Sequence, residues 1–396
     1  MRSVSLRSLC LALALVPTST ALPAQNTAQL DSIIESGIRR GVYPGAVLVI
    51  GTRAGVTYQR GYGHLTWNAR SPVPSPDSTL YDLASLTKVV GTMPAIARLV
   101  EEKRVDLAAP VSRYLPRFSG GKKDAVTIRM LLDHTSGLPA YIEFFKLTKT
   151  RDSAIALLYR TPLRRSPGAS AEYSDLNFLL LGLVIEAVTG EPLDRAVTRL
   201  VLEPAGFSQT RYGVTAAMKP RTAPSGQWRG TPICCVVNDQ NAARMGGAAG
   251  HAGLFGTGAD LARYLRFWLN QGSLDGRRLL APETVRAFLL PGSPDATRLL
   301  GWERPPHRNG DCGGTGAGRG TGDHKGGPCD SAYGSRLSDA AFGHTGWTGT
   351  LIWADPGRDL FLVLLTNRSY APRGGNSLRA LRGIRGALAD AIAGGQ

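Results

Sequence analysis

The sequence predicts an α+β fold in which an antiparallel sheet is flanked by helices and joined to a mostly helical region. Strand hairpins are expected near both ends of the chain, whereas the middle shows mainly helical periodicity. Because strand signals lie at both ends with helices between them, both hairpins are expected to share one sheet, with the helical region inserted between them. We therefore expect an α/β region made of residues 22–84 and 336–396 and a helical region over residues 85–335.

The amino-terminal part of the sheet region is expected to begin with a helix. Apolar residues between positions 30 and 38 recur at helical spacing, and Gly41 marks the end of this helix. Residues 46–50 and 56–62 predict two strands joined as a hairpin. The Pro- and Ser-rich residues 71–78 predict a loop before the next helix.

The carboxy-terminal part carries the second pair of strand signals. Residues 348–354 and 360–366 predict strands, and the turn sequence Asp355-Pro356-Gly357-Arg358-Asp359 separates them. An Arg-rich segment over residues 378–392 predicts the closing helix. These elements complete the expected sheet.

The middle of the chain is expected to be mainly helical. Residues 176–188 are apolar nearly all round, which predicts a buried helix, and Gly190 is its stop signal. Residues 261–268 show the apolar face of another helix. Residues 303–335 are rich in Gly and Pro, lack apolar periodicity and contain no nucleotide fingerprint, so they predict an irregular surface loop.

The first 21 residues have the features of a secretory signal. Arg2 and Arg7 give a basic start, residues 9–16 are apolar, and Ser19-Thr20-Ala21 offers a cleavage site with small residues. The longest later apolar run, residues 178–188, is too short for a membrane helix. We expect a secreted or periplasmic protein.

The chain is strongly basic, with a net charge of +16 from 46 Lys and Arg against 30 Asp and Glu. The basic residues are scattered, aromatic residues are not interleaved with them, and no nucleic-acid motif is present. We therefore expect no nucleic-acid partner and a peripheral association with an anionic cell envelope. The sequence leaves the oligomeric state open.

The cysteines predict disulfides. Five are present, and Cys10 lies in the apolar part of the signal. An even number in an oxidising compartment favours bridges, and four cysteines allow three pairings, of which Cys312–Cys329 would close the loop between them. Because Cys312, His324 and Cys329 match no zinc-ligand spacing, we expect no metal, and we expect no cofactor. The four other cysteines are Cys234, Cys235, Cys312 and Cys329.

The first candidate for chemistry is Ser85-Leu86-Thr87-Lys88, at the start of a helical pattern that includes Pro94 as an early position or a kink. Ser85 and Lys88 are three residues apart and so lie on the same side of a helix. A hydroxyl becomes a good nucleophile when a base removes its proton. Lys88 can act as this base if burial or a nearby cation lowers its pKa.

The second candidate is Glu172-Tyr173-Ser174-Asp175-Leu176-Asn177, just before the predicted buried helix. Tyr173 can relay a proton if a neighbouring lysine favours its phenolate. Asp175 and Asn177 are candidates for substrate contact or for capping the helix, and the sequence leaves both roles open.

The third candidate is Gly343-His344-Thr345-Gly346-Trp347, entering a predicted strand. Small residues such as Gly346 allow a ligand or another backbone to approach the strand edge. An N–H at that edge can join the Ser85 N–H in binding an oxyanion. His344 can bind a carboxylate or assist proton movement, or it can be a packed structural residue.

In this order, the three candidates follow the arrangement of penicillin-recognising serine enzymes. The chain resembles the serine β-lactamase and D-alanyl-D-alanine carboxypeptidase superfamily, on its class C β-lactamase-like branch, over roughly residues 28–393. Residues 127–138 and 250–264 also resemble that branch. The resemblance implies the β-lactamase/transpeptidase-like fold.

The resemblance also implies a mechanism. Ser85 would attack a carbonyl and form an acyl-enzyme, which water would then hydrolyse. Lys88 and Tyr173 would share the general-base and general-acid steps. The N–H groups of Ser85 and Trp347 would form the oxyanion hole.

The implied substrate-binding residues include two departures from the family pattern. His344 and Thr345 would hold a substrate carboxylate, but β-lactamases of this branch have Lys in place of His344. Asp175 stands where many relatives have Asn, which puts the usual hydrogen bond to a substrate amide in doubt, and Asn177 is the alternative donor. The histidine form resembles D,D-peptidases and peptide or ester hydrolases more than efficient β-lactamases.

The sequence therefore predicts an exported serine hydrolase that acts on D-Ala-D-Ala-type cell-wall peptides. A β-lactamase and a carboxylesterase are the alternative enzymes. A penicillin or muropeptide sensor that is acylated without turnover is the alternative outside catalysis. His134 and His251 are expected to be structural, because each lies beside a turn where a side chain can bond to backbone.

Overall fold

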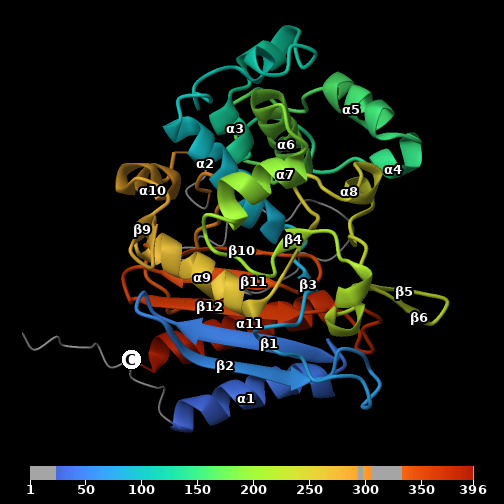
Figure 1. Ribbon diagram of the computed structural model, residues 1–396, viewed down its shortest axis with the longest axis vertical. Helices are drawn as coiled ribbons and strands as arrows, with labels where there is room; N and C mark the ends of the chain where they lie inside the picture. The colour runs from blue at the N-terminus through green and yellow to red at the C-terminus, as the bar shows by residue number, and fades with distance from the viewer. Residues whose placement is uncertain (1–23, 293–297, 306–331, 396) are drawn as a thin grey trace, which may run out of the picture.

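The computed structural model of the chain describes residues 24–292, 298–305 and 332–395. Its largest sheet is antiparallel and has the strand order β10-β11-β12-β1-β2, so strands from the two chain ends lie side by side (Figure 1). Strands β1 and β12 are paired from Ala46 opposite Thr366 to Gly51 opposite Phe361. The strands are β1 (Gly45–Gly51), β2 (Val56–Gly63), β10 (Phe342–Thr345), β11 (Leu351–Asp355) and β12 (Leu360–Thr366).

Helices cover both faces of this sheet (Figure 1). Side chains alternate along a strand, so Val47 and Val49 of β1 join the core that includes helix α9 (Gly258–Leu269). Leu48 faces the other core, which contains helices α1 (Ala24–Arg39) and α11 (Ser377–Gly394). The predicted antiparallel sheet flanked by helices is confirmed.

The helical region lies beyond the α9 face of the sheet (Figure 1). Helix α6 is buried over most of its length and ends at Gly190, whose φ of 74° favours glycine. The predicted segment around Pro94 is divided into a π-helical turn, η1, and helix α2, with Pro94 in the first turn of α2. The helical elements are η1 (Lys88–Thr92), α2 (Met93–Glu101), η2 (Val111–Arg113), η3 (Gly121–Ala125), α3 (Ile128–Leu132), α4 (Phe144–Leu147), α5 (Arg151–Arg160), α6 (Asp175–Thr189), α7 (Leu193–Val197), η4 (Thr198–Leu202), η5 (Ala216–Arg221), α8 (Gln240–Arg244) and α10 (Pro282–Leu289).

Short strands that the sequence did not reveal connect the two regions. Strand β7 pairs with β3 on one side and β4 on the other, which fixes the segment that leads directly to Ser85. A hairpin of β5 and β6 extends to the side of the molecule (Figure 1). These strands are β3 (Tyr81–Asp82), β4 (Arg211–Tyr212), β5 (Gly226–Trp228), β6 (Thr231–Ile233), β7 (Leu254–Gly256), β8 (Ser273–Leu274) and β9 (Arg277–Arg278).

Several predictions fall on residues outside the described ranges. They concern the signal over residues 1–21, most of the 303–335 segment, and the pair Cys312–Cys329. Within the described residues Cys234 is bridged to its neighbour Cys235, and the pairing Cys312–Cys329 stays a prediction.

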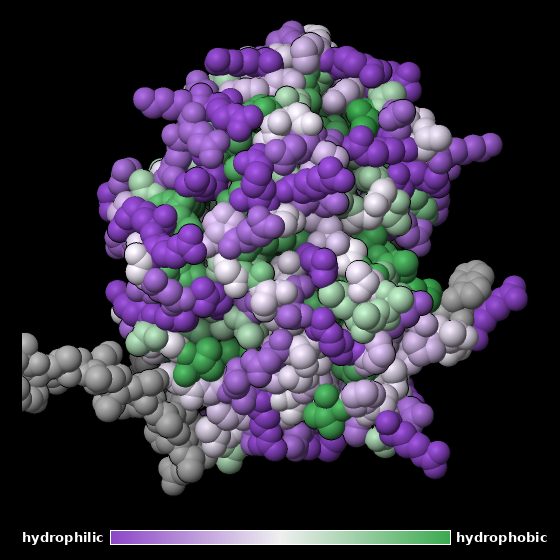
Figure 2. Space-filling view, viewed as in Figure 1, coloured by the Kyte–Doolittle hydropathy of each residue, from purple (hydrophilic) through white to green (hydrophobic). Residues whose placement is uncertain are grey.

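Hydrophilic side chains cover most of the face in Figure 2, and hydrophobic ones form small separate groups. Among the described helices, no single one is long and apolar enough to cross a membrane. Helix α6 and the segment Leu193–Leu202 are together long and apolar enough for a membrane span, but this pair is bent by 81°.

Candidate active site

Ser85 lies in a tight turn between β3 and η1. The residue before it, Ala84, has a φ of 46°, which is unusual for a side-chain-bearing residue, and its N–H donates to Asp82 Oδ1 at 2.8 Å. Asp82 is buried and also accepts from Asn238 N at 2.6 Å. Ser85 is partly exposed although its neighbours are buried. The turn therefore presents one hydroxyl from a fixed backbone.

Two side chains are hydrogen bonded to this hydroxyl. Lys88 Nζ donates to Ser85 Oγ at 2.9 Å, and Tyr173 OH donates to the same oxygen at 2.9 Å. The Lys88 Nζ also lies 4.9 Å from the centre of the Tyr173 ring. The structure thus brings together the three residues that the sequence marked for nucleophilic chemistry, from η1 and from the loop before α6.

The charge state of Lys88 is set by a neighbouring carboxylate. Lys88 is fully buried, and burial alone would lower its pKa, but the charge of Asp175, followed by that of Tyr173, outweighs burial and raises the pKa. Lys88 Nζ donates to Asp175 Oδ1 at 2.7 Å and to the His251 carbonyl at 3.3 Å. The condition under which Lys88 would act as a free base, a lowered pKa, is therefore not met, because a carboxylate lies beside the ammonium.

Tyr173 is held as a neutral phenol. Burial raises its pKa, and the opposing effect of Lys88 does not reverse this shift. The phenolate is therefore not the resting form of Tyr173. His134 fixes the loop: its Nδ1 accepts from Ser174 N at 3.1 Å, its carbonyl accepts from Glu172 N at 2.9 Å, and its ring lies 4.8 Å from the Tyr173 ring. The structural role predicted for His134 is confirmed.

Asp175 and Asn177 take different places although both begin α6. Asp175 points to Lys88, as described above. Asn177 is fully buried; its Oδ1 accepts from Ser136 Oγ at 2.6 Å, and its amide nitrogen lies 3.1 Å from His134 Nδ1. The Asn177 amide is occupied by these internal hydrogen bonds, so the geometry gives no support to a substrate contact there.

On the sheet side, His344 of β10 is almost fully buried, with its ring 5.9 Å from the Tyr173 ring. Its Nδ1 donates to the Thr345 carbonyl at 2.8 Å, which leaves Nε2 as an acceptor. Burial lowers the pKa of His344 to about 4, so the ring is neutral at pH 7. His344 is therefore not a cation in the resting site.

The turn after β10 lies against the Ser85 segment. Thr348 Oγ1 donates to the Asp82 carbonyl at 2.7 Å, and Gly346 is so close to Leu83 that an added Cβ would lie 2.7 Å from the Leu83 oxygen. Trp347 is 60% exposed. Across the described part of the chain, neither the Ser85 N–H nor the Trp347 N–H donates a hydrogen bond. Both donors are available for an oxyanion, and Thr345 lies beside them, half-buried.

The sequence did not reveal Arg298 as a site residue. Its guanidinium carbon lies 5.5 Å from the centre of the Tyr173 ring, and the side chain is only 4% exposed. It forms an ion pair with Glu303 at 3.1 Å. No motif surrounds Arg298, so only its tertiary position identifies it.

Asp175, Asp239 and His251 could in principle hold a metal ion, because one ligand atom from each lies within 4.8 Å of the others. These atoms already have partners: Asp175 pairs with Lys88, and His251 Nε2 donates to Asp239 Oδ1 at 2.9 Å. Neighbouring hydrogen bonds and the His251 side chain lower the pKa of Asp239 to about 2 despite its burial. The cluster is a network of internal ion pairs and hydrogen bonds beside Lys88.

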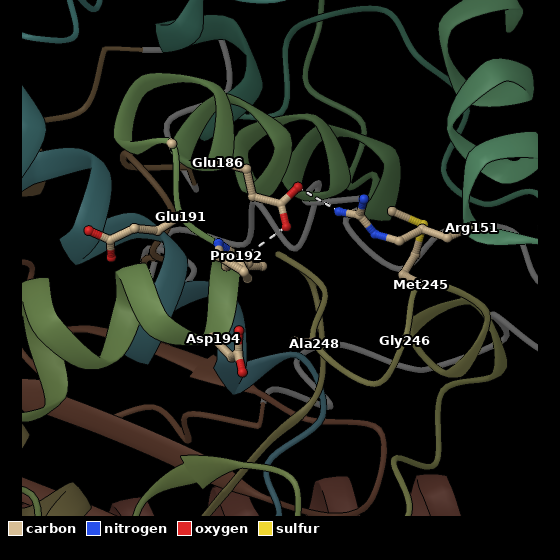
Figure 3. Close-up of a pocket in the computed structure, with 10 residues that line it drawn as sticks. Arg151, Glu186, Glu191, Pro192, Asp194, Met245, Gly246 and Ala248 are labelled. Carbon is tan, nitrogen blue, oxygen red and sulfur yellow. Dashed lines mark hydrogen bonds and ion pairs between the residues drawn. The ribbon is translucent and has the colours of Figure 1, made fainter.

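A separate cavity of about 480 Å³ is lined by residues of α5, α6 and α7 and by the loop after α8 (Figure 3). Glu186 accepts there from Arg151 at 2.5 Å and from Leu193 N at 3.2 Å. None of the predicted site residues lines this cavity. We therefore place the candidate active site at Ser85.

The chain matches the family model named Beta-lactamase over residues 30–386. An N-acetylmuramyl-L-alanine amidase from Bacillus subtilis (strain 168) is 32% identical over 378 residues, which cover 87% of this chain and 81% of that protein. A putative D-alanyl-D-alanine carboxypeptidase from Escherichia coli (strain K12) is 29% identical over 390 residues, which cover 90% of this chain and 85% of that protein.

Solved structures have the same fold. A penicillin-binding protein homologue from Caulobacter crescentus superposes with a TM-score of 0.69 at 22% identity, covering 96% of this chain and 99% of the other. A class C β-lactamase superposes with a TM-score of 0.72 at 18% identity, covering 92% and 96%. The fold, the match to the family model and the position of Ser85 between Lys88 and Tyr173 agree. The chain belongs to the β-lactamase family and is a serine hydrolase.

Proposed function

We propose that this serine hydrolase is exported and removes the terminal residue from D-Ala-D-Ala-type cell-wall peptides through an acyl-enzyme on Ser85. The observation that carries the acyl-enzyme is the pair of 2.9 Å hydrogen bonds from Lys88 and Tyr173 to Ser85 Oγ. The signal-like residues 1–21 support export, and the basic net charge of +16 favours contact with an anionic envelope.

The proposed chemistry has two steps. In the first, Ser85 Oγ bonds to the carbonyl carbon while the Ser85 and Trp347 N–H groups bind the oxygen; the carbon–nitrogen bond then breaks, and Tyr173 is placed to give a proton to the leaving amine. In the second, water attacks the ester and frees Ser85. Each oxyanion donor is expected to lower the activation barrier by about 3–4 kcal/mol.

A terminal carboxylate favours a cation, and Arg298, which is 4% exposed and paired with Glu303, would have to exchange part of that ion pair for the substrate carboxylate. The Arg298 charge lies beside Tyr173, and guanidinium groups bind carboxylates in a two-pronged arrangement. A putative D-alanyl-D-alanine carboxypeptidase is among the relatives of similar length, which supports the same substrate class. We therefore assign carboxylate recognition to Arg298, with Thr345 as a neighbouring hydrogen-bond donor.

The test compares four substrates under one set of conditions. We expect D-alanine release from a D-Ala-D-Ala peptide to exceed cephalosporin ring opening, short-chain ester cleavage and cleavage of a muramyl-L-alanine amide. The matched control peptide has a C-terminal amide in place of the carboxylate. Arg298→Gln is expected to lower kcat/KM for the free acid at least tenfold and to leave the amide unaffected; equal losses for both would remove the carboxylate assignment.

A second candidate is an ester hydrolase, which the neutral His344 favours because an uncharged substrate needs no cation there. Faster ester cleavage than D-alanine release would select it. Stable labelling by fluorescent penicillin without turnover of any substrate would instead indicate a sensor.

A further inference from the structure

Asp175 is the charged partner of the lysine that contacts the nucleophile. We propose that Asp175 is the final acceptor of the Ser85 proton, and that Lys88 passes the proton from one to the other. This inference rests on the proposed function only in that Ser85 must be acylated. Asp175 does not touch the substrate in this account and is a positioning residue that acts through Lys88.

The atoms form a continuous chain. Ser85 Oγ lies 2.9 Å from Lys88 Nζ, and Nζ lies 2.7 Å from Asp175 Oδ1. Lys88 is fully buried, and its Nζ faces the rings of Tyr173 at 4.9 Å and Phe178 at 5.8 Å. The Asp175 side chain is 18% exposed. The proton on Nζ therefore has a partner inside the protein at hydrogen-bond distance.

The charges around Lys88 keep it an ammonium in the resting site. Asp175 bonds to Nζ directly, and Asp239 adds a second ionised carboxylate nearby. Among the described residues, the other titratable or charged groups that face this region are Tyr141, Tyr173, His134, His344, His251 and Arg298. Tyr173 and His344 are neutral, burial also lowers the pKa of His134 well below its ordinary value, and burial raises the pKa of Tyr141, so these four groups do not cancel the effect of the two carboxylates. An ammonium cannot accept the Ser85 proton until it has given one away.

The proton transfer balances in charge and atoms. One proton moves from Nζ to Asp175 Oδ1, which leaves a neutral amine and a neutral acid. The amine lone pair then takes the Ser85 proton as Oγ bonds to the carbonyl carbon and the carbonyl electron pair moves to the oxygen. The pair Lys88–Asp175 gains one positive charge, which matches the new oxyanion. When the bond to the leaving group breaks, the proton returns by way of Lys88 or Tyr173.

The direction of a pH shift distinguishes this relay from a free lysine base. We compare the pH profile of kcat/KM for a chromogenic short-chain ester, and of labelling by a fluorophosphonate probe, in the wild type and in Asp175→Asn. The relay predicts a wild-type rate that no longer rises with pH at neutrality, because a carboxylate and not a free amine takes the proton. In Asp175→Asn, Lys88 itself must be neutral, so the acid limb moves to higher pH and the rate at pH 6 falls at least tenfold.

The opposite shift would overturn the inference. If the Lys88 amine were the base in the wild type, the carboxylate would hold its pKa high, and Asp175→Asn would move the acid limb to lower pH. An unchanged limb would show that Asp175 is only structural. Asp175→Glu should recover much of the lost rate, and Glu172→Gln is the matched control because Glu172 lies in the same loop and pairs with Arg165 at 2.7 Å.

The wild type alone provides a second measurement if Asp175→Asn does not fold. A rate that rises about tenfold per pH unit up to pH 9 would contradict the relay, because it would report a free amine. A probe-labelling profile with the expected plateau, together with no release of D-alanine, would retain the relay and reject the proposed substrate. Absence of probe labelling at Ser85 at every pH would reject both.

Discussion

The two sides of the active site supply different kinds of groups. The helical side provides side chains that carry protons, namely Ser85, Lys88, Tyr173 and Asp175. The hydrogen bonds that link them are 2.7 to 2.9 Å long. The sheet side provides backbone and neutral groups from β10 and the turn after it. Changes on the helical side should therefore act on proton transfer, whereas changes on the sheet side should act on geometry and on stability.

The largest effect is expected from removing the phenol on the helical side. Tyr173→Phe keeps the ring between His134 and Lys88 but loses the hydrogen bond to Ser85 Oγ. General acid–base groups contribute about 10²- to 10⁴-fold, so we expect kcat to fall by that factor with KM nearly unchanged. Steady-state kinetics on the best substrate checks this. A fall in kcat of less than threefold would mean that Lys88 serves both proton steps.

On the sheet side, Gly346→Ala should displace the turn that carries Trp347. The new Cβ would lie 2.1 Å from Thr350 Oγ1 and 2.7 Å from the Leu83 oxygen, so the backbone must move. Loss of one oxyanion donor costs about 10²- to 10³-fold in kcat. Gly375→Ala is the control, because its Cβ would meet open space. Unchanged kcat in Gly346→Ala would show that the Trp347 N–H is not an oxyanion donor.

The neutrality of the sheet side can be tested through stability. Burial lowers the pKa of His344 from 6.5 to about 4, so the unfolded chain binds the proton more tightly. The His344 contribution to the free energy of unfolding is therefore fully present above pH 6.5 and is lost as the pH falls toward 4. Between pH 7.5 and 4.5, the wild type should lose roughly 2–3 kcal/mol of unfolding free energy that His344→Asn does not lose.

Urea denaturation at the two pH values measures this difference. Parallel losses of stability in the wild type and in His344→Asn would mean that His344 can be charged in the folded protein. It would then be able to hold a carboxylate as a cation, and the contrast between the two sides would weaken.

The smallest effect is expected at the Cys234–Cys235 bridge, which lies outside both sides. The bridge joins adjacent residues and so closes almost no chain, which limits its stabilising effect to about 1 kcal/mol. The double variant with serine at both positions should keep kcat within twofold. A large fall in kcat would show that this segment, through the Asn238 N–H bound to Asp82, positions Ser85. Peptide mapping before and after reduction would also test Cys312–Cys329.

Much of the fold could be predicted from the sequence, because its main elements have strong local signals. The terminal hairpins and the buried helix that ends at Gly190 lie where periodicity and turn residues place them. Strand β11 begins at Leu351 rather than at 348, because the preceding residues form the turn against the Ser85 segment. Strands β3, β4 and β7 have two or three residues each and are too short to give a pattern.

The candidate site was predictable where spacing along the chain carries it and not where tertiary contacts decide. Ser85 and Lys88 follow from a three-residue spacing on a helical turn. The raised pKa of Lys88 depends on Asp175, which is distant in sequence, and the burial of Asn177 depends on Ser136 and His134. These contacts exist only after folding, so no local pattern reports them.

Mapping the acyl-enzyme decides whether Ser85 is the nucleophile. After incubation with penicillin, intact mass should increase by one adduct, and peptide mapping should place it on Ser85. The adduct should be absent in Ser85→Ala and unchanged in Ser119→Ala, which alters an exposed serine away from the site. An adduct on any other residue, or an adduct that persists in Ser85→Ala, would contradict the account.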